Sequence, residues 1–213
     1  MEQSASRTNI LKKIRKALNT PVPLPFPESD GPIYPFTPAK EDLSVLFAEE
    51  FTKLLGNFSY CANDAELVNQ TSSLVGMKSW KEIYCADSAL LSLFKTHGFN
   101  NFSGLPLAQS DAAITSCEVL IARTGSIVLS SAQAEGRTAS VYSPVHICIA
   151  RTSQLVFDIS DALTNMQKKY SNEFPSMVTL ATGPSRTADI EKTLVVGVHG
   201  PKEVYCFLVE DGD

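Results

Sequence analysis

Apolar positions switch between helical and strand-like spacing in the first half of the chain. Apolar residues three and four apart predict helices, and short apolar runs between them predict strands. The expected helices are 41–55, 64–75 and 88–95, and the expected strands are 58–62 and 81–86. This βαβα succession is typical of an α/β fold with a mainly parallel sheet flanked by helices. Asn63 is expected to cap the second helix and Gly76 to end it.

The second half of the chain is richer in strand-like runs. We predict further strands over 112–115, 126–130, 145–150, 177–181 and 203–210, and helices over 155–170 and 188–194. Residues 145–150 are almost continuously apolar, as expected of a strand that is buried on both faces.

The N-terminal segment is different in character. Residues 6–18 show the spacing of an amphipathic helix, and alternating prolines from Pro21 to Pro27 then favour an extended strap. We therefore divide the chain into an arm, 1–38, and an α/β domain, 39–213. Docking of the arm on its own domain is the favoured interpretation, because termini are commonly tied down in this way. A homodimer, in which the arm docks on a second copy, is the alternative.

Composition and charge narrow the function classes. The 213 residues carry a net charge of −5, which argues against broad nucleic-acid binding, because that needs a basic face. No apolar run reaches the length that spans a bilayer, and the N-terminus lacks the apolar region of a secretory signal. We therefore expect a cytoplasmic protein. The five cysteines form no C-x-x-C pair, so no metal site is predicted, and Cys85, Cys148 and Cys206 are expected to be reduced thiols in apolar runs.

Three polar loops are candidates for chemistry, and we expect them at the carboxyl ends of strands, where open α/β sheets bind ligands. In the first, Thr124 and Gly125 make a small-residue turn that lets backbone N–H groups approach an anion. A tight hairpin turn is the alternative. In the second, Arg137 follows Glu135 and Gly136 and has a geometry suited to phosphate or carboxylate. A solvated connection is the alternative there.

The third loop holds the most concentrated polar group. Ser185 and Arg186 precede the helix expected from residue 188, with Thr187 as its cap, and a helix N-terminus attracts anions. Asp189 lies in the first turn and is a candidate to bind ligand hydroxyls or to orient Arg186. His199 stands before the final strand and is a candidate general acid or base, although a lone histidine is more often structural.

The other two histidines are expected to be structural. His146 lies inside an apolar run, which favours a core or strand-end position. His97 lies at an expected helix C-terminus, where an imidazolium suits the helix dipole. The common nucleotide-binding, hydrolase and zinc-protease motifs are absent from the sequence.

Four segments, in this order, resemble the lactate utilization protein C family, which is built on the LUD domain: TGSIVLSS, EGRTAS, SPVHICIA and TGPSRTADIEKTLVVGVHGPKEVYCFLVED. The start, ILKKIRKAL followed by the proline-rich strap, is similar too. The resemblance implies a sugar-phosphate isomerase and CoA-transferase-like α/β fold, which also occurs in formyltetrahydrofolate cyclo-ligase.

The resemblance also implies a function. Members of the family act with two iron–sulfur partner proteins in oxidising L-lactate to pyruvate, so the clusters are expected on the partners and no cofactor on this chain. Relatives often carry an acidic residue before the Thr-Gly pair, where this chain has Arg123. The family's motif positions fall here on Thr124, Gly125, Glu135, Gly136, Arg137, His146, Ser185, Arg186, Thr187, Asp189, Glu191, His199 and Gly200.

The leading hypothesis is a subunit of a lactate-oxidising assembly that binds a small anionic ligand at loops 124–137 and 183–200. The ligand-binding candidates are Thr124, Gly125, Arg137, Ser185, Arg186 and Thr187, and the catalytic candidates are His199, Asp189 and Glu135. Two alternatives stay open. One is a stand-alone enzyme of the same fold acting on a phosphorylated or CoA-linked substrate, and the other is a non-catalytic assembly module that uses the 1–38 arm.

Overall fold

The computed structural model describes residues 5–18, 42–134, 138–171, 173–190 and 193–212. The chain divides into two compact units, Met1–Thr37 and Pro38–Asp213, which we call the arm and the body. Within the arm, α1 (Ala5–Leu18) confirms the predicted amphipathic helix. The proline-rich strap lies outside the described residues. None of the described helices is long and apolar enough to cross a membrane.

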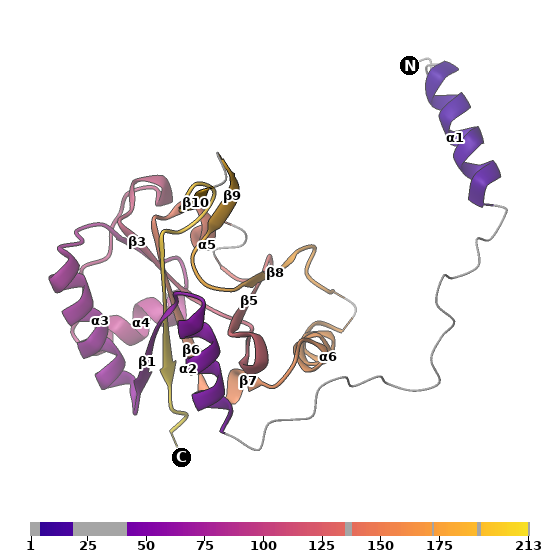
Figure 1. Ribbon diagram of the computed structural model, residues 1–213. Coiled ribbons are helices and arrows are strands. Elements are labelled where there is room, and N and C mark those ends of the chain that lie inside the picture. Colours follow the sequence, from indigo (N-terminus) through magenta and orange to yellow (C-terminus); the bar gives the residue numbers. More distant parts are fainter. Residues whose placement is uncertain (1–4, 19–41, 135–137, 172, 191–192, 213) are drawn as a thin grey trace. The chain divides into compact units, whose positions relative to one another are not determined.

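The body is built on a parallel sheet of five strands (Figure 1), which confirms the predicted fold class. In spatial order the strands are β1 (Asn57–Cys61), β11 (Glu203–Val209), β6 (Val145–Arg151), β3 (Ala112–Ser116) and β2 (Ile83–Tyr84). All four neighbouring pairs are parallel. The strand β6 lies in the middle of the sheet and is buried on both faces, as its apolar sequence predicts.

Alternate residues of β6 build two different cores, because successive side chains of a strand point to opposite faces. Ile147 and Ile149 belong to the core that is covered by α3 (Asp64–Lys78) and α4 (Ser88–Thr96). Cys148 and Ala150 belong to the core on the other face, where Phe47 and Phe51 of α2 (Leu43–Lys53) pack. Asn63 caps α3 as predicted, but the helix continues past Gly76 to Lys78.

A second sheet, not anticipated from the sequence, packs beside α2 (Figure 1). Its order is β7 (Leu155–Val156), β4 (Val119–Ile121), β5 (Ser126–Ser130) and β8 (Val178–Ala181), with both parallel and antiparallel pairs. The helix α6 (Ile159–Tyr170) packs against this sheet through Ala162 and Met166. The predicted helix over 155–170 was therefore too long at its start. Asp158 marks the true beginning of α6, because its carboxylate accepts the Ile159 N–H at 2.6 Å.

Short elements complete the body. They are η1 (Leu107–Gln109), η2 (Ala122–Thr124), η3 (Thr152–Gln154), α5 (Ala139–Tyr142), β9 (Arg186–Ile190) and β10 (Thr193–Val196). All five cysteines are free thiols, with Cys148 and Cys206 buried and Cys85 half-buried. Among the described residues, no group of three His, Cys, Asp or Glu side chains is placed to hold a metal ion.

Gly125 is the residue that lets the second sheet pack against α2. It ends η2 with φ +57°, and a Cβ at this position would lie 2.5 Å from the backbone nitrogen of Phe51. We expect Gly125→Ala to lower the free energy of unfolding by roughly 2–4 kcal/mol, because the left-handed backbone and the clash both cost energy. Urea unfolding measures the change. Gly76→Ala is the control, because that helical position has open space and should gain slightly in stability.

Candidate functional site

Two short sequences of the last resemblance segment, GPSRT (183–187) and GVHGP (197–201), meet in the body. The Ser185 N–H donates to the Pro201 carbonyl oxygen at 3.0 Å, and the Gly197 N–H donates to the Ser185 carbonyl oxygen at 2.9 Å. The hairpin of β9 and β10 lies between these segments in the chain and returns it to the same place. The GPSRT and GVHGP sequences are therefore structural partners.

A pocket of about 530 Å³ opens beside this junction, and we call it the loop pocket. One wall is the end of α5 and the residues that lead into β6, and the other is the GVHGP loop that leads into β11. Figure 1 shows α5 next to the β9–β10 hairpin, at the end of the body opposite the C-terminus. The lining residues are Val141, Tyr142, Ser143, Pro144, Gly197, Val198, His199, Gly200 and Lys202.

The loop pocket lies at the amino ends of β6 and β11, not at the carboxyl ends that we expected. Pro144 directly precedes β6, and Lys202 directly precedes β11. The Lys202 N–H donates to the Pro144 carbonyl oxygen at 2.8 Å and so holds the two lead-in segments together. Ligands of open α/β sheets usually bind at the carboxyl ends of the strands. Here the GPSRT and GVHGP segments flank a hairpin that leads into β11, so they lie at the start of that strand.

Two glycines give the GVHGP loop its shape. Gly197 has φ +79°, and a Cβ there would lie 2.2 Å from Cγ of Lys202. A Cβ on Gly200 would lie 2.9 Å from Cβ of Ser185. Gly197 thus leaves room for the stem of the lysine side chain to lie across the loop, and Gly200 lets the Ser185 side chain approach closely.

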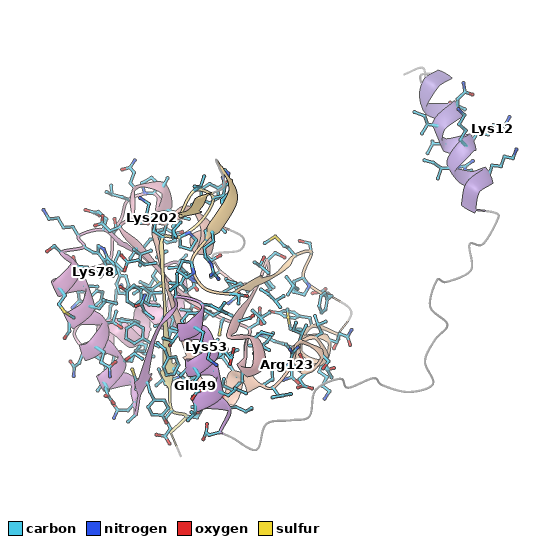
Figure 2. All side chains as sticks on the ribbon, viewed as in Figure 1. Lys12, Glu49, Lys53, Lys78, Arg123 and Lys202 are labelled. Atoms are coloured by element: carbon cyan, nitrogen blue, oxygen red, sulfur yellow. The ribbon has the colours of Figure 1, made fainter. Side chains whose placement is uncertain are left out.

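The described lining of the loop pocket is cationic or neutral. Lys202 and His199 are exposed, and no carboxylate side chain is among the described lining residues. Arg186 is also exposed and starts β9, one residue after Ser185. Figure 2 shows Lys202 at the same end of the body as the hairpin. An exposed ammonium, with no carboxylate among the described lining residues, favours an anionic ligand.

The helix predicted over 188–194 is wrong. Residues 186–190 form β9, and residues 193–196 form β10, with Thr187 opposite Val195 in the antiparallel pair. The β-branched residues at both positions favour a strand. Thr187 therefore caps no helix, and the argument for an anion site at a helix N-terminus no longer applies. The side chains of Asp189 and Glu191 lie outside what the structure describes.

The Thr124–Gly125 turn is a hairpin connection between the antiparallel strands β4 and β5. The Gly125 N–H donates to the Ala122 carbonyl oxygen at 3.3 Å. The hydroxyl of Thr124 lies 2.8 Å from that of Ser126, which lies 2.9 Å from the Thr182 hydroxyl. This chain of hydroxyls connects the turn to the segment that begins the GPSRT motif.

Glu135, Gly136 and Arg137 lie outside the described residues. Thr138 follows them and leads directly into α5, whose end lines the loop pocket. The segment with Arg137 is therefore adjacent in sequence to α5, and the end of α5 forms part of the pocket wall.

Arg123, which precedes the Thr-Gly pair, forms an ion pair in this structure (Figure 2). Its guanidinium lies 2.6 Å from the Asp158 carboxylate, which also caps α6. The hydrogen bond from Arg123 is the main reason that the pKa of Asp158 lies below its ordinary value. This position therefore connects η2 to α6 in the present chain.

His146 is a buried histidine of β6, as the sequence analysis expected. Its Nε2 lies 2.8 Å from the Thr115 hydroxyl of the neighbouring strand, and its Nδ1 has no hydrogen-bond partner among the described residues. Burial lowers the pKa of His146 to about 4, so the side chain is neutral at neutral pH. His97 caps the C-terminus of α4, as predicted, with Nδ1 3.0 Å from the Leu93 carbonyl oxygen.

Glu118 is a buried polar residue that lies outside the sequence motifs described above. Its carboxylate is buried at the start of β4 and lies 2.6 Å from the Ser130 hydroxyl, 2.7 Å from the Tyr170 hydroxyl and 2.7 Å from Nζ of Lys169. Burial alone raises the pKa of Glu118, but these hydrogen bonds outweigh it and leave the pKa below its ordinary value. An acid directly before the apolar run 119–122 was the available signal.

Comparison with known protein families gives a match for the second half of the chain. Residues 106–209 match the model of the LUD domain, and this range includes every residue of the loop pocket. This part of the chain is similar to the LUD domain. The resemblance inferred from the motifs is thereby confirmed. Residues 38–105 belong to the same compact body, although the match begins after them.

Relatives extend the comparison. An uncharacterized protein of Neisseria meningitidis is 37% identical over 114 residues, which are 54% of this chain and 45% of that protein. Lactate utilization protein C of Bacillus licheniformis is 36% identical over 105 residues, 48% of this chain and 44% of that protein. Lactate utilization protein C 1 of Bacillus mycoides is 32% identical over 134 residues, 57% of each protein. The chain thus spans about half the length of the curated relatives that it matches.

A solved structure supports the fold. The crystal structure of a DUF162 family protein from Deinococcus radiodurans superposes with a TM-score of 0.59 at 21% identity, over 78% of this chain and 96% of that one. At this identity the likeness shows a shared α/β architecture.

Proposed function

We propose that this chain is a component of a cytoplasmic system that oxidises L-lactate to pyruvate together with iron–sulfur partner proteins. One observation carries the proposal. The part of the chain that matches the domain of lactate utilization protein C also builds the loop pocket, where the GPSRT and GVHGP sequences meet. A small carboxylate such as lactate or pyruvate is the ligand class that the charges of this pocket favour.

Two cationic side chains would bind the ligand. Lys202 would pair with the carboxylate as a charge-assisted hydrogen-bond donor, and Arg186 would add a second positive charge at the rim. His199 would lie beside the hydroxyl group of the ligand and accept its proton, as a general base does. Oxidation of L-lactate to pyruvate releases two electrons and two protons, and the iron–sulfur clusters of the partner proteins would accept the electrons.

Lys202→Gln tests the binding half of the proposal. We expect the affinity of the full chain for L-lactate and pyruvate to fall at least tenfold, because a hydrogen bond to a charged group is worth about 1.5–3 kcal/mol. Isothermal titration measures the affinity, and Arg186→Gln should weaken it in the same direction. Lys95→Gln is the control, because Lys95 is an exposed lysine on α4. Equal affinities for wild type and Lys202→Gln would show that the ligand site lies elsewhere.

Growth on L-lactate tests the proposed role of the chain in lactate oxidation. A strain without this chain should fail to grow on L-lactate as its carbon source and should regain growth with the wild-type gene but not with Lys202→Gln. Normal growth of the deletion strain would refute the lactate role. Turnover of acyl-CoA or sugar-phosphate substrates by the purified chain alone would instead favour the stand-alone enzyme.

A further inference from the structure

The loop pocket combines a cation with apolar side chains. Lys202 supplies the positive charge, and Val141, Tyr142 and Val198 supply apolar surface. These three apolar side chains are 41%, 67% and 39% exposed, so much of their surface is available to a ligand. Apolar side chains that gather in a pocket beside one charged group favour a ligand that has both an apolar and a charged part.

The apolar side chains stand on both walls of the loop pocket. Val141 and Tyr142 belong to the end of α5, which forms one wall, and Val198 belongs to the GVHGP loop, which forms the other. Figure 1 shows α5 next to the β9–β10 hairpin, and Figure 2 shows Lys202 at the same end of the body. A ligand between the walls can therefore contact apolar surface on two sides.

Hydrogen bonds hold the two walls at their base. The Lys202 N–H donates to the Pro144 carbonyl oxygen at 2.8 Å and joins one wall to the other. Ser143 is buried, and its hydroxyl lies 3.2 Å from that of Ser110 at the end of η1. The pocket of about 530 Å³ is thus preformed, and pockets of roughly 300–1,000 Å³ bury drug-sized ligands. Lactate, whose apolar part is one methyl group, would fill only a small part of this volume.

We infer that the loop pocket prefers 2-hydroxy acids whose side chain is larger than the methyl group of lactate and is branched or aromatic. Lys202 binds the carboxylate, and Tyr142 and Val198 enclose the apolar side chain from two sides and determine the specificity. Burial of that side chain is favourable in proportion to the apolar area removed from water, and an aromatic ring also packs well against Tyr142. The inference rests on the proposed function, which assigns the carboxylate to this pocket, and it extends the substrate class.

L-Phenyllactate is the probe that tests the inference, because it differs from L-lactate by one phenyl group. Isothermal titration of the full chain with each acid gives the ratio of the two affinities. We expect L-phenyllactate to bind at least tenfold more tightly than L-lactate. Tyr142→Ala/Val198→Ala should lower this ratio to about threefold or less, because the ligand ring loses contacts on both walls. Val45→Ala, which changes an exposed valine on α2, is the control and should keep the ratio within about twofold of the wild-type value.

Two further sets of variants complete the test. Tyr142→Ala and Val198→Ala alone should each lower the ratio in part, and because both side chains are exposed we expect these variants to fold, which urea unfolding checks. Lys202→Gln should weaken the binding of both acids by a similar factor and leave the ratio unchanged, because the carboxylate is common to both acids.

The outcomes separate this inference from the function on which it rests. Equal affinities of the wild type for the two acids would overturn the inference, and so would the same ratio in the wild type and Tyr142→Ala/Val198→Ala. Lactate binding that depends on Lys202 would then leave the proposed function intact. Binding of L-phenyllactate that Lys202→Gln does not weaken would also overturn the inference. Binding of neither acid to the wild type would contradict the proposed ligand class and the inference together.

Discussion

Protonation of His146 should destabilise the body by about 3 kcal/mol between pH 7 and pH 4. Its pKa is about 4 in the folded chain, because the imidazole is buried, against 6.5 for an unperturbed histidine. The unfolded chain therefore binds a proton at a higher pH than the folded chain does. Stability falls as the pH drops through 6.5 and stops changing on this account below about pH 4, since both states are then protonated.

His146→Asn isolates this contribution, because asparagine is polar and does not titrate. The free energy of unfolding of each protein is measured by urea at half-unit steps from pH 7 to pH 4.5. The variant is expected to start from a lower stability, since the bond to Thr115 changes, and to lose less of it on acidification. Most of the difference between the stability losses of wild type and His146→Asn should arise between pH 6.5 and pH 5, above the range in which carboxylates titrate. Parallel curves for the two proteins would mean that His146 is not buried as a neutral base.

The parallel sheet could be predicted from the sequence because its signals are local. Apolar runs such as 145–150 have strand spacing, and residues such as Asn63 cap the helices that follow. These features act within a few residues of chain, so they can be recognised without knowledge of what packs against them. The predicted end of α3 at Gly76 was wrong because it also relied on a local signal. An isolated glycine weakens a helix without necessarily ending it.

The second sheet and the hairpin could not be predicted in this way. Residues 119–121 make a strand of three residues, too short for a periodic signal, and its partners are spread over the chain. The segment 186–190 carries an apparent cap and one first-turn acid, yet pairing with 193–196 decides its structure. Tertiary pairing overrides local propensity in both places. The loop pocket depends on that pairing, because the hairpin is what brings Ser185 back to Pro201.

Loss of the Glu118 carboxylate should destabilise the body by about 3 kcal/mol. This one group joins three parts of the body, since it accepts hydrogen bonds from Ser130 at the end of β5 and from Lys169 and Tyr170 at the end of α6. Glu118→Ala would leave the Ser130 hydroxyl, which is fully buried, without this acceptor. Each buried polar group left unsatisfied costs about 1–3 kcal/mol, and a cavity adds to that. Lys169 is 61% exposed and would return to water at little cost.

The chemistry of the carboxylate, and not only its volume, should matter. Glu118→Gln keeps one acceptor oxygen but no negative charge, so we expect it to lie between wild type and Glu118→Ala in urea unfolding. Because the pKa of Glu118 is lowered in the folded chain, its contribution is present above the ordinary carboxylate pKa and is lost as the pH falls through the folded value. Glu173→Ala, an exposed glutamate just after α6, is the control and should change stability by less than about 0.5 kcal/mol. An unchanged unfolding midpoint for Glu118→Ala would show that the carboxylate does not hold the second sheet and α6 together.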